Sequence, residues 1–177
     1  MGKHLFILLS VFTLLACQER QETSKVQYKG PKSVLDNIDM IYSDSARPMV
    51  RMVTAKQLTL FTEDRVYPKE VKLYFFDKLG NVTTQIRGDS ARFNRVKNHY
   101  HLMGHVVIHN PIKGETLRTS EFYWLPDQKK IYTEKAVQIR TKQEVFYGIG
   151  MDANQDFSSY ALRKVTNSVF VMNEFPQ

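Results

Sequence analysis

The stretch Leu102-Met103-Gly104-His105-Val106-Val107-Ile108-His109 largely decides the fold class of this chain. Its even positions carry the apolar side chains of Leu102, Val106 and Ile108, whereas His105 and His109 occupy odd positions. Successive side chains of a β-strand point to opposite faces of the sheet, so this period of two is typical of a strand that buries one face. We therefore expect a strand here, with its even positions in the core.

The same alternation recurs on both sides of this stretch. Val71 to Phe75 is apolar at odd positions, and a later run places Ile131, Thr133, Val137 and Ile139 on one face. Polar turn clusters separate the runs at residues 77–81, 94–98, 110–114, 126–130, 140–144 and 154–159. All but the cluster at 140–144 contain Gly, Pro, Asn or Asp, which favour tight reversals. No window between residues 50 and 177 offers an amphipathic helical stripe with a cap. The sequence thus predicts an all-β fold.

Most of the long runs are interrupted near the middle. The interruptions lie at Arg87-Gly88-Asp89, Gly104, Thr119-Ser120, Lys135 and Gly148-Ile149-Gly150. Glycine inside a strand usually marks a bulge or a sharp bend. Each long run is therefore predicted to form two short strands joined at a corner.

An internal repeat relates positions 31 residues apart. Inward positions correspond to inward positions: Ile86 to Leu117, Ala91 to Phe122, Phe93 to Trp124, Val106 to Val137 and Ile108 to Ile139. Self-similarity at a fixed period indicates equivalent units stacked along an axis. Stacked bent units of this kind would make an elongated, folded sheet with an apolar seam inside.

The first seventeen residues are typical of an export signal. Lys3 precedes an apolar segment from Leu5 to Leu15, and Leu14-Leu15-Ala16-Cys17 resembles the lipobox of bacterial lipoproteins. We expect a signal peptide over residues 1–16. A flexible tether over 17–33 would follow, beginning at the lipidated Cys17, and a β-domain would occupy residues 34–177. Two or more acyl chains, such as palmitate, anchor a protein stably to a membrane.

Composition excludes several classes of protein. The 177 residues are 42% hydrophobic and 24% charged, as in an ordinary globular domain, and the net charge of +7 permits an anionic partner. The Leu5–Leu15 segment is shorter than the ~20 residues of a spanning helix, so a polytopic membrane protein is excluded. One cysteine rules out a disulfide scaffold. No nucleophile elbow, dinucleotide-binding loop or paired carboxylates suggest an enzyme.

Four of the five histidines fall within one short segment, which raises the question of a metal site. All four occupy odd positions, opposite the apolar face, and should project outward along a single strand: His99, His101, His105 and His109. No cysteine assists them, and they lie too far apart along the strand to surround one ion. We predict no metal site and no cofactor.

An ordered series of short patterns resembles the LptC family of lipopolysaccharide-export proteins and the wider OstA-like β-jelly-roll group. The series covers roughly residues 35–170 and consists of Gly104-x-Val106-x-Ile108, Gly114-x-x-Leu117-x-Thr119, Phe122-x-Trp124, Ile131-x-Thr133, Val137-x-Ile139, Gly148-x-Gly150-Met151-x-Ala153 and Tyr160-x-Leu162. The resemblance implies an elongated, twisted β-jelly roll of stacked, bent antiparallel strands. The better-known members have a membrane-spanning helix where this chain has a lipobox.

The resemblance also implies a function and partners. The protein would be a non-catalytic component that accepts lipopolysaccharide from an inner-membrane ABC transporter with LptF/LptG-type subunits and passes it to a periplasmic LptA/OstA-type jelly-roll protein. We expect a lipid-anchored, periplasm-facing protein of the cell envelope, at the inner membrane, that binds no nucleic acid. The alternative is a stand-alone lipid-binding or structural envelope lipoprotein on the same fold.

Two sets of site residues follow from this expectation. An apolar trough for lipid would be lined by the inward residues, of which Phe93 and Trp124 are the largest at equivalent positions; the other candidates are Leu73, Phe75, Ile86, Leu102, Val106, Ile108, Leu117, Val137 and Ile139. Each of them could instead simply fill the core. Partners would add strands at two free sheet edges, one within residues 39–60 and one formed at the C-terminal end by Tyr160, Leu162, Val169 and Val171.

Overall fold

The computed structural model describes residues 28–170. Cys17, the predicted signal peptide, the tether as far as residue 27 and Val171 lie outside this range. The described chain forms eleven strands: β1 (Ser33–Asp44), β2 (Arg47–Thr59), β3 (Arg65–Tyr67), β4 (Val71–Phe76), β5 (Val82–Gly88), β6 (Ser90–Asn94), β7 (His99–Asn110), β8 (Glu115–Leu125), β9 (Lys130–Arg140), β10 (Glu144–Asn154) and β11 (Tyr160–Phe170). Residues 28–170 contain no helix, and thus none that could cross a membrane.

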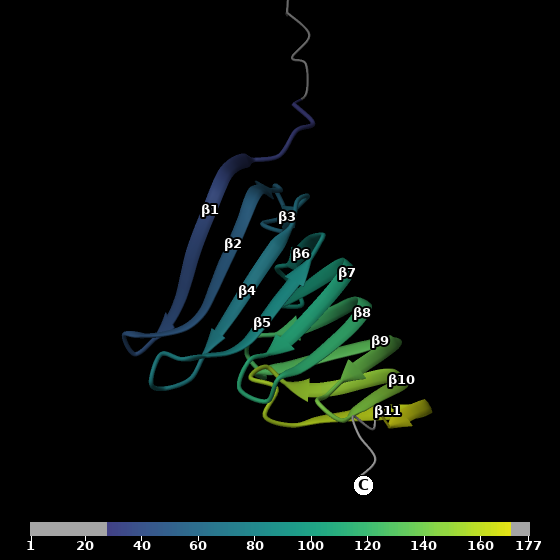
Figure 1. Ribbon diagram of the computed structural model, residues 1–177. Helices are drawn as coiled ribbons and strands as arrows, with labels where there is room; N and C mark the ends of the chain where they lie inside the picture. Colours follow the sequence, from purple (N-terminus) through teal and green to yellow (C-terminus); the bar gives the residue numbers. More distant parts are fainter. Residues whose placement is uncertain (1–27, 171–177) are drawn as a thin grey trace, which may run out of the picture.

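All eleven strands belong to one antiparallel sheet whose pairing follows chain order. β3 and β4 act as one bent strand, interrupted at residues 68–70, and β5 and β6 as another, interrupted at Asp89. With these two pairs counted as bent strands, each strand pairs with the next along the chain, from β1 to β11 (Figure 1). The predicted all-β jelly roll of stacked, bent antiparallel strands is confirmed.

The predicted corners are real, but most do not break the strand. Only the interruption at Arg87-Gly88-Asp89 separates two strands, whereas β7, β8, β9 and β10 each run through their predicted corner. Register shifts absorb the bend instead, for example between Met103 and Val106. Gly104 and Gly150 take positive φ angles of 76° and 73°, a backbone conformation that is strained for other residues. A bulge with such a glycine bends a strand while pairing continues on either side, so the expectation of two separate strands was wrong at these positions.

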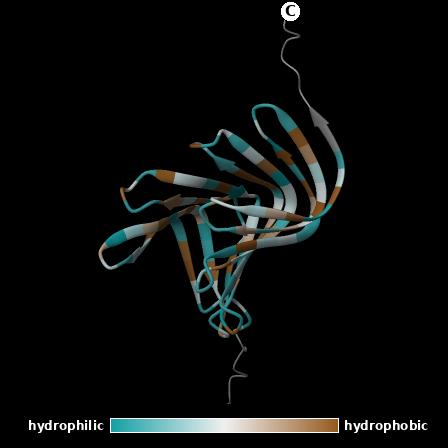
Figure 2. Cartoon of the chain, turned by 90° about the horizontal axis from the view of Figure 1, so that it is seen from below, coloured by the Kyte–Doolittle hydropathy of each residue, from teal (hydrophilic) through white to brown (hydrophobic). Residues whose placement is uncertain are grey.

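The bends fold the sheet lengthwise into two walls that face each other, as seen end-on in Figure 2. Turns close the strands alternately at the margin of one wall and of the other, so two rows of turns border an open mouth. The walls touch through side chains: the rings of Phe75 and Trp124 lie 5.2 Å apart edge to face, and the hydroxyls of Tyr42 and Tyr100 lie 2.7 Å apart.

The core fills the space between the walls. Leu102, Val106 and Ile108 are buried, as the even-position pattern predicts. Residues related by the offset of 31 occupy equivalent inward positions two bent strands apart, and all ten of them are buried. The repeat is therefore the period of the meander itself.

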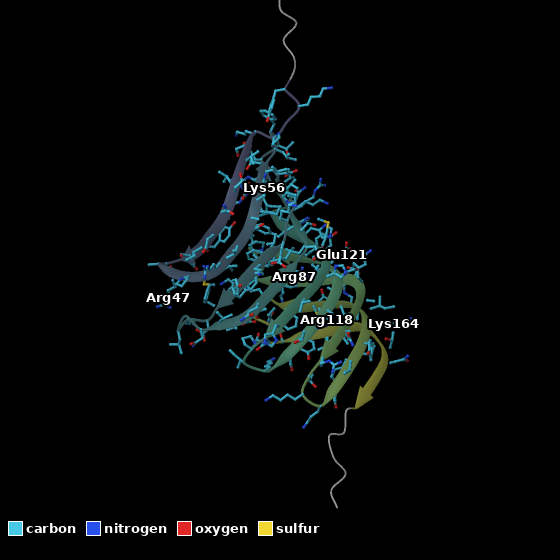
Figure 3. The ribbon with its side chains drawn as sticks, turned by 45° about the horizontal axis from the view of Figure 1, so that its top comes forward. Arg47, Lys56, Arg87, Arg118, Glu121 and Lys164 are labelled. Atoms are coloured by element: carbon cyan, nitrogen blue, oxygen red, sulfur yellow. The ribbon has the colours of Figure 1, made fainter. Side chains whose placement is uncertain are left out.

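The outer surface of the sheet is polar. Charged side chains such as Arg87, Arg118 and Lys164 extend from it into solvent (Figure 3). The odd-numbered histidines of β7 lie on this face, as predicted, and His101 contacts the carboxylate of Glu121 at 3.1 Å. Among the residues that the structure describes, no group of three or more His, Cys, Asp or Glu side chains could hold a metal ion.

Candidate functional site

A cavity of about 440 Å³ opens between the two walls near the β1–β2 end of the molecule. β1 and β2 contribute Tyr42, Met49 and Val50 to one side of it. Strands of the opposite wall contribute the aromatic side chains of Phe93, Tyr100 and Trp124. The cavity thus has apolar and aromatic sides, a shape and chemistry suited to an apolar group held out of water.

The predicted trough residues divide into two groups. All of them belong to one buried hydrophobic cluster. Of these, only Phe93 and Trp124 also line the cavity, and the other nine fill the core behind it: Leu73, Phe75, Ile86, Leu102, Val106, Ile108, Leu117, Val137 and Ile139. The trough is therefore a packed seam with an open pocket at one end, rather than an empty channel along its whole length.

The aromatic side of the cavity is held in place by its neighbours. The ring of Tyr100 lies between Phe93, at 4.7 Å, and Trp124, at 4.9 Å between centroids. The indole Nε1 of Trp124 donates a hydrogen bond of 3.0 Å to the amide oxygen of Gln155. Burial, followed by the nearby phenols of Tyr42 and Tyr67, raises the pKa of Tyr100, so its hydroxyl stays protonated at neutral pH.

An arginine lies beside this aromatic group. Arg65 and Tyr67 share the inward face of β3, whereas Val66 points outward. The guanidinium of Arg65 lies 4.5 Å from the ring centroid of Phe93, a cation–π contact. Arg65 and Tyr67 cannot be predicted from the sequence, because three residues are too few to show a periodic pattern. Tyr100 is also absent from the predicted residues, although it continues the even-position pattern of β7 by one more position.

The mouth differs along its length. Near the β1–β2 end, a second cavity of about 570 Å³ lies between the turns that contain Ser45 and Lys78 and the opposite turns that contain Lys129 and Asp156. Farther along, Lys113 crosses the mouth. Its Nζ donates hydrogen bonds to the backbone carbonyls of Phe157, at 3.1 Å, and Ser158, at 3.0 Å. The mouth is open at one end and bridged at the other.

The sheet has two edge strands, β1 and β11. The first edge was misplaced in part: only residues 39–44 of the predicted range 39–60 lie on β1, and most of the rest belongs to β2, which is paired on both sides. Within residues 28–170, β1 pairs only with β2 and β11 only with β10. Tyr160 and Leu162 on β11 pack their side chains against the core, so their contribution to a partner would come from the backbone. Val169 pairs with Val145 of β10. Exposed apolar side chains lie on both edge strands: Ile41 on β1 and Val165 on β11 are 58% and 57% exposed.

The chain matches a known protein family over most of its length. Residues 4–169 match the family described as "Lipopolysaccharide-assembly, LptC-related". A search of curated proteins gives no match. The matched segment spans nearly the whole chain, including the entire described sheet as far as residue 169, and the bent all-β architecture agrees with it. The chain therefore belongs to the LptC family.

Proposed function

We propose that this protein carries lipopolysaccharide from an inner-membrane ABC transporter to the next jelly-roll protein in the periplasm. Membership of the LptC family assigns the chain to lipopolysaccharide transport at the periplasmic face of the cell envelope. The finer proposal is that LptF/LptG-type subunits deliver the lipid at the β1 end and that an LptA/OstA-type protein receives it at the β11 end. In this role the protein acts by binding, without catalysis, and Cys17 carries the lipid anchor that tethers it to the inner membrane.

The cavity between the walls is the observation that carries this proposal. An acyl chain exposed to water costs about 0.8 kcal/mol for each methylene, so lipopolysaccharide with several chains does not cross the periplasm unaided. The aromatic pocket formed by Phe93, Tyr100 and Trp124 offers an apolar surface at the end of the molecule where the mouth is open. Acyl chains that enter here would replace water against this surface.

The free edges supply the connections. An unpaired strand presents a row of N–H and C=O groups that a strand of another protein can extend. Addition of a strand at β1 and of another at β11 would make one continuous sheet through all three proteins. The apolar seams would then be continuous from one protein to the next.

Photocrosslinking tests the lipid contact. A photoreactive amino acid at position 93 or 124 should give adducts with lipopolysaccharide in cells, whereas the same residue at Tyr132, half-buried on the outer face of β9, should give none. Adducts at Tyr132 alone, or at none of the three positions, would contradict a lipid-binding trough.

Two matched edge variants test the connections and separate the transport role from that of a stand-alone lipoprotein. Ile41→Asp and Val165→Asp each place a charge at an equally exposed edge position. We expect Ile41→Asp to lower copurification with the transporter, and Val165→Asp to lower capture of the LptA/OstA-type protein. Loss of neither partner, or the same loss with both variants, would argue against separate docking edges.

A further inference from the structure

We propose that Arg65 forms the centre of a phosphate-binding site inside the cavity, which holds a phosphate group on the lipid portion of lipopolysaccharide while the acyl chains lie against the aromatic side. This inference rests on the proposed function, because it identifies which part of the transported lipid the cavity recognises.

Arg65 is a cation placed where a β-sandwich core normally carries an apolar residue. Its position on β3 directs it inward beside Tyr67, which is fully buried, and opposite Phe93 in the register of β3 and β6. Half-buried charges are usually paired with an opposite charge. In the described part of the chain, however, no ion pair joins Arg65 to a carboxylate, and its closest polar neighbours are phenols. The guanidinium is therefore free to take an anionic ligand.

A second polar group at this place also lacks a partner. The hydroxyl of Tyr67 is buried and has no hydrogen-bond partner among residues 28–170. Burial raises the pKa of Tyr67 to about 12, so its hydroxyl is a donor at neutral pH. A buried donor without an acceptor is costly and unusual in a folded protein. An anion next to Arg65 would supply the negative charge that the neighbouring phenols do not provide, and an acceptor for the hydroxyl of Tyr67.

The rim of the cavity adds further charge of both signs. Arg95 and Lys129 line it together with Asp44 and Asp127. Asp127 already accepts a hydrogen bond from the side chain of Asn98. In the residues that the structure describes, neither Arg95 nor Lys129 forms an ion pair with a carboxylate. The two carboxylates balance the two cations of the rim, so the net positive charge of the cavity lining comes from Arg65.

A phosphate monoester attached to a lipid fits this arrangement better than a free anion. The planar guanidinium of arginine presents five donors in a fork that binds phosphate oxygens in pairs. The same cavity carries Phe93, Tyr100 and Trp124, which a free phosphate would leave in contact with water. An apolar body joined to the phosphate would cover these rings. The ligand class is thus a phosphorylated amphiphile.

The intrinsic fluorescence of Trp124 provides the measurement, because it is the only tryptophan of the chain and it lines the cavity. The full-length protein in detergent is titrated with lipid A that carries two phosphates and with lipid A from which both have been removed. We expect the phosphorylated form to bind more tightly, on the order of tenfold, as is typical when a hydrogen bond to a charged group is lost. Arg65→Met should bind both forms with the weaker affinity.

Arg92→Met is the matched control. Arg92 is an exposed arginine on the outer face of β6, opposite Val66 in the register. The Arg92→Met variant should bind both lipids with the affinity of the unaltered protein. If it loses as much affinity for the phosphorylated lipid as Arg65→Met does, general surface charge explains the binding and the proposal is overturned. Tyr67→Phe should also weaken binding of the phosphorylated lipid, and this variant tests the site even where Arg65→Met fails to fold.

The outcomes separate this inference from the proposed function. Equal affinity of the unaltered protein for both lipids would overturn the phosphate site and leave the lipid-transport role standing. Binding of neither lipid would overturn both. Inorganic phosphate at millimolar concentration should not displace the phosphorylated lipid. If inorganic phosphate reverses the fluorescence change, the site takes free phosphate and the proposal is wrong about the lipid.

Discussion

The two ends of the folded sheet share one repeat but treat the mouth between the walls in different ways. At the β1–β2 end the turn consists of Ser45 and Ala46, and beneath it lies the cavity beside Tyr42 and Tyr100. At the β10–β11 end a longer connection places Phe157 in the core, and Lys113 ties that connection to the opposite row of turns. The strands thus form the two walls, whereas the turns and connections between the strands determine where the space between the walls is open.

The largest effect expected from this contrast concerns core stability. Phe93 and Phe122 lie on the same wall, but Phe93 lines the cavity, whereas Phe122 is fully buried in the packed seam. Phe122→Ala should lower the free energy of unfolding by about 4 kcal/mol, because the void cannot collapse. Phe93→Ala should cost clearly less, because the space left by the ring would join the neighbouring cavity and could fill with water. Urea unfolding followed by the fluorescence of Trp124 measures both.

The smaller truncation Phe122→Leu provides the control, and it should cost less than half as much as Phe122→Ala, because it leaves a smaller void. Equal losses for Phe93→Ala and Phe122→Ala would mean that the open end is as tightly packed as the rest. The contrast between the two ends would then be wrong.

The sequence predicts the packed end better than the open end. The even positions Leu102, Val106 and Ile108 and the offset of 31 identify the core correctly, because a long strand repeats its in–out pattern several times. The sequence locates the bends correctly, but the prediction that each bend separates two strands is wrong. Glycine is found both at a bulge, such as the one at Gly104 and His105, and at a break between two strands. Local patterns do not distinguish the two.

The open end depends on contacts that no local pattern contains. Tyr42 and Tyr100 meet through their hydroxyls although 58 residues separate them in the chain. Arg65 faces inward on a strand of three residues, where an arginine would ordinarily be assigned to the surface. The candidate trough residues were predicted as a group because they are apolar and periodic. The polar residues that distinguish the cavity from the core are neither.

A smaller effect is expected from the bridge at the closed end. Lys113→Met keeps the aliphatic length of the side chain but removes the hydrogen bonds to the carbonyls of Phe157 and Ser158. It should lower the free energy of unfolding by about 1–2 kcal/mol and speed hydrogen exchange of the amides near residue 157. Lys142→Met, in the next turn along the same row, is the control and should change neither quantity. Unaltered exchange in Lys113→Met would show that Phe157 alone closes this end.

The contact between the walls at the open end should contribute even less to stability than the hydrogen bonds of Lys113. Tyr42→Phe removes the hydroxyl contact of 2.7 Å with Tyr100 and should cost about 1 kcal/mol or less, because the site is partly open to water that can replace the lost group. Thermal unfolding monitored by circular dichroism measures the change. A loss larger than that of Lys113→Met would reverse the order of the two cross-wall links and would make the open end the more rigid one.

The smallest expected effect is on the stability of the protein at acid pH. Each edge strand carries one Asp–Arg pair, Asp39–Arg51 at β1 and Asp152–Arg163 at β11, and in both a hydrogen bond from the arginine lowers the pKa of the carboxyl group. A carboxylate with a depressed pKa in the folded state contributes stability above its unfolded pKa of about 3.9, and this contribution is lost as the pH falls through the folded value. Arg163 also contacts Glu134, so the pair at β11 should contribute more to stability than the pair at β1.

Melting temperatures measured between about pH 5 and pH 2 should therefore fall less steeply in Arg163→Met than in the unaltered protein. Arg51→Met should show a smaller change of the same sign, and high salt should reduce both because the pairs are exposed. A steeper fall in Arg163→Met would mean that the pair does not stabilise the β11 edge, which would leave backbone pairing with β10 to hold that strand in place.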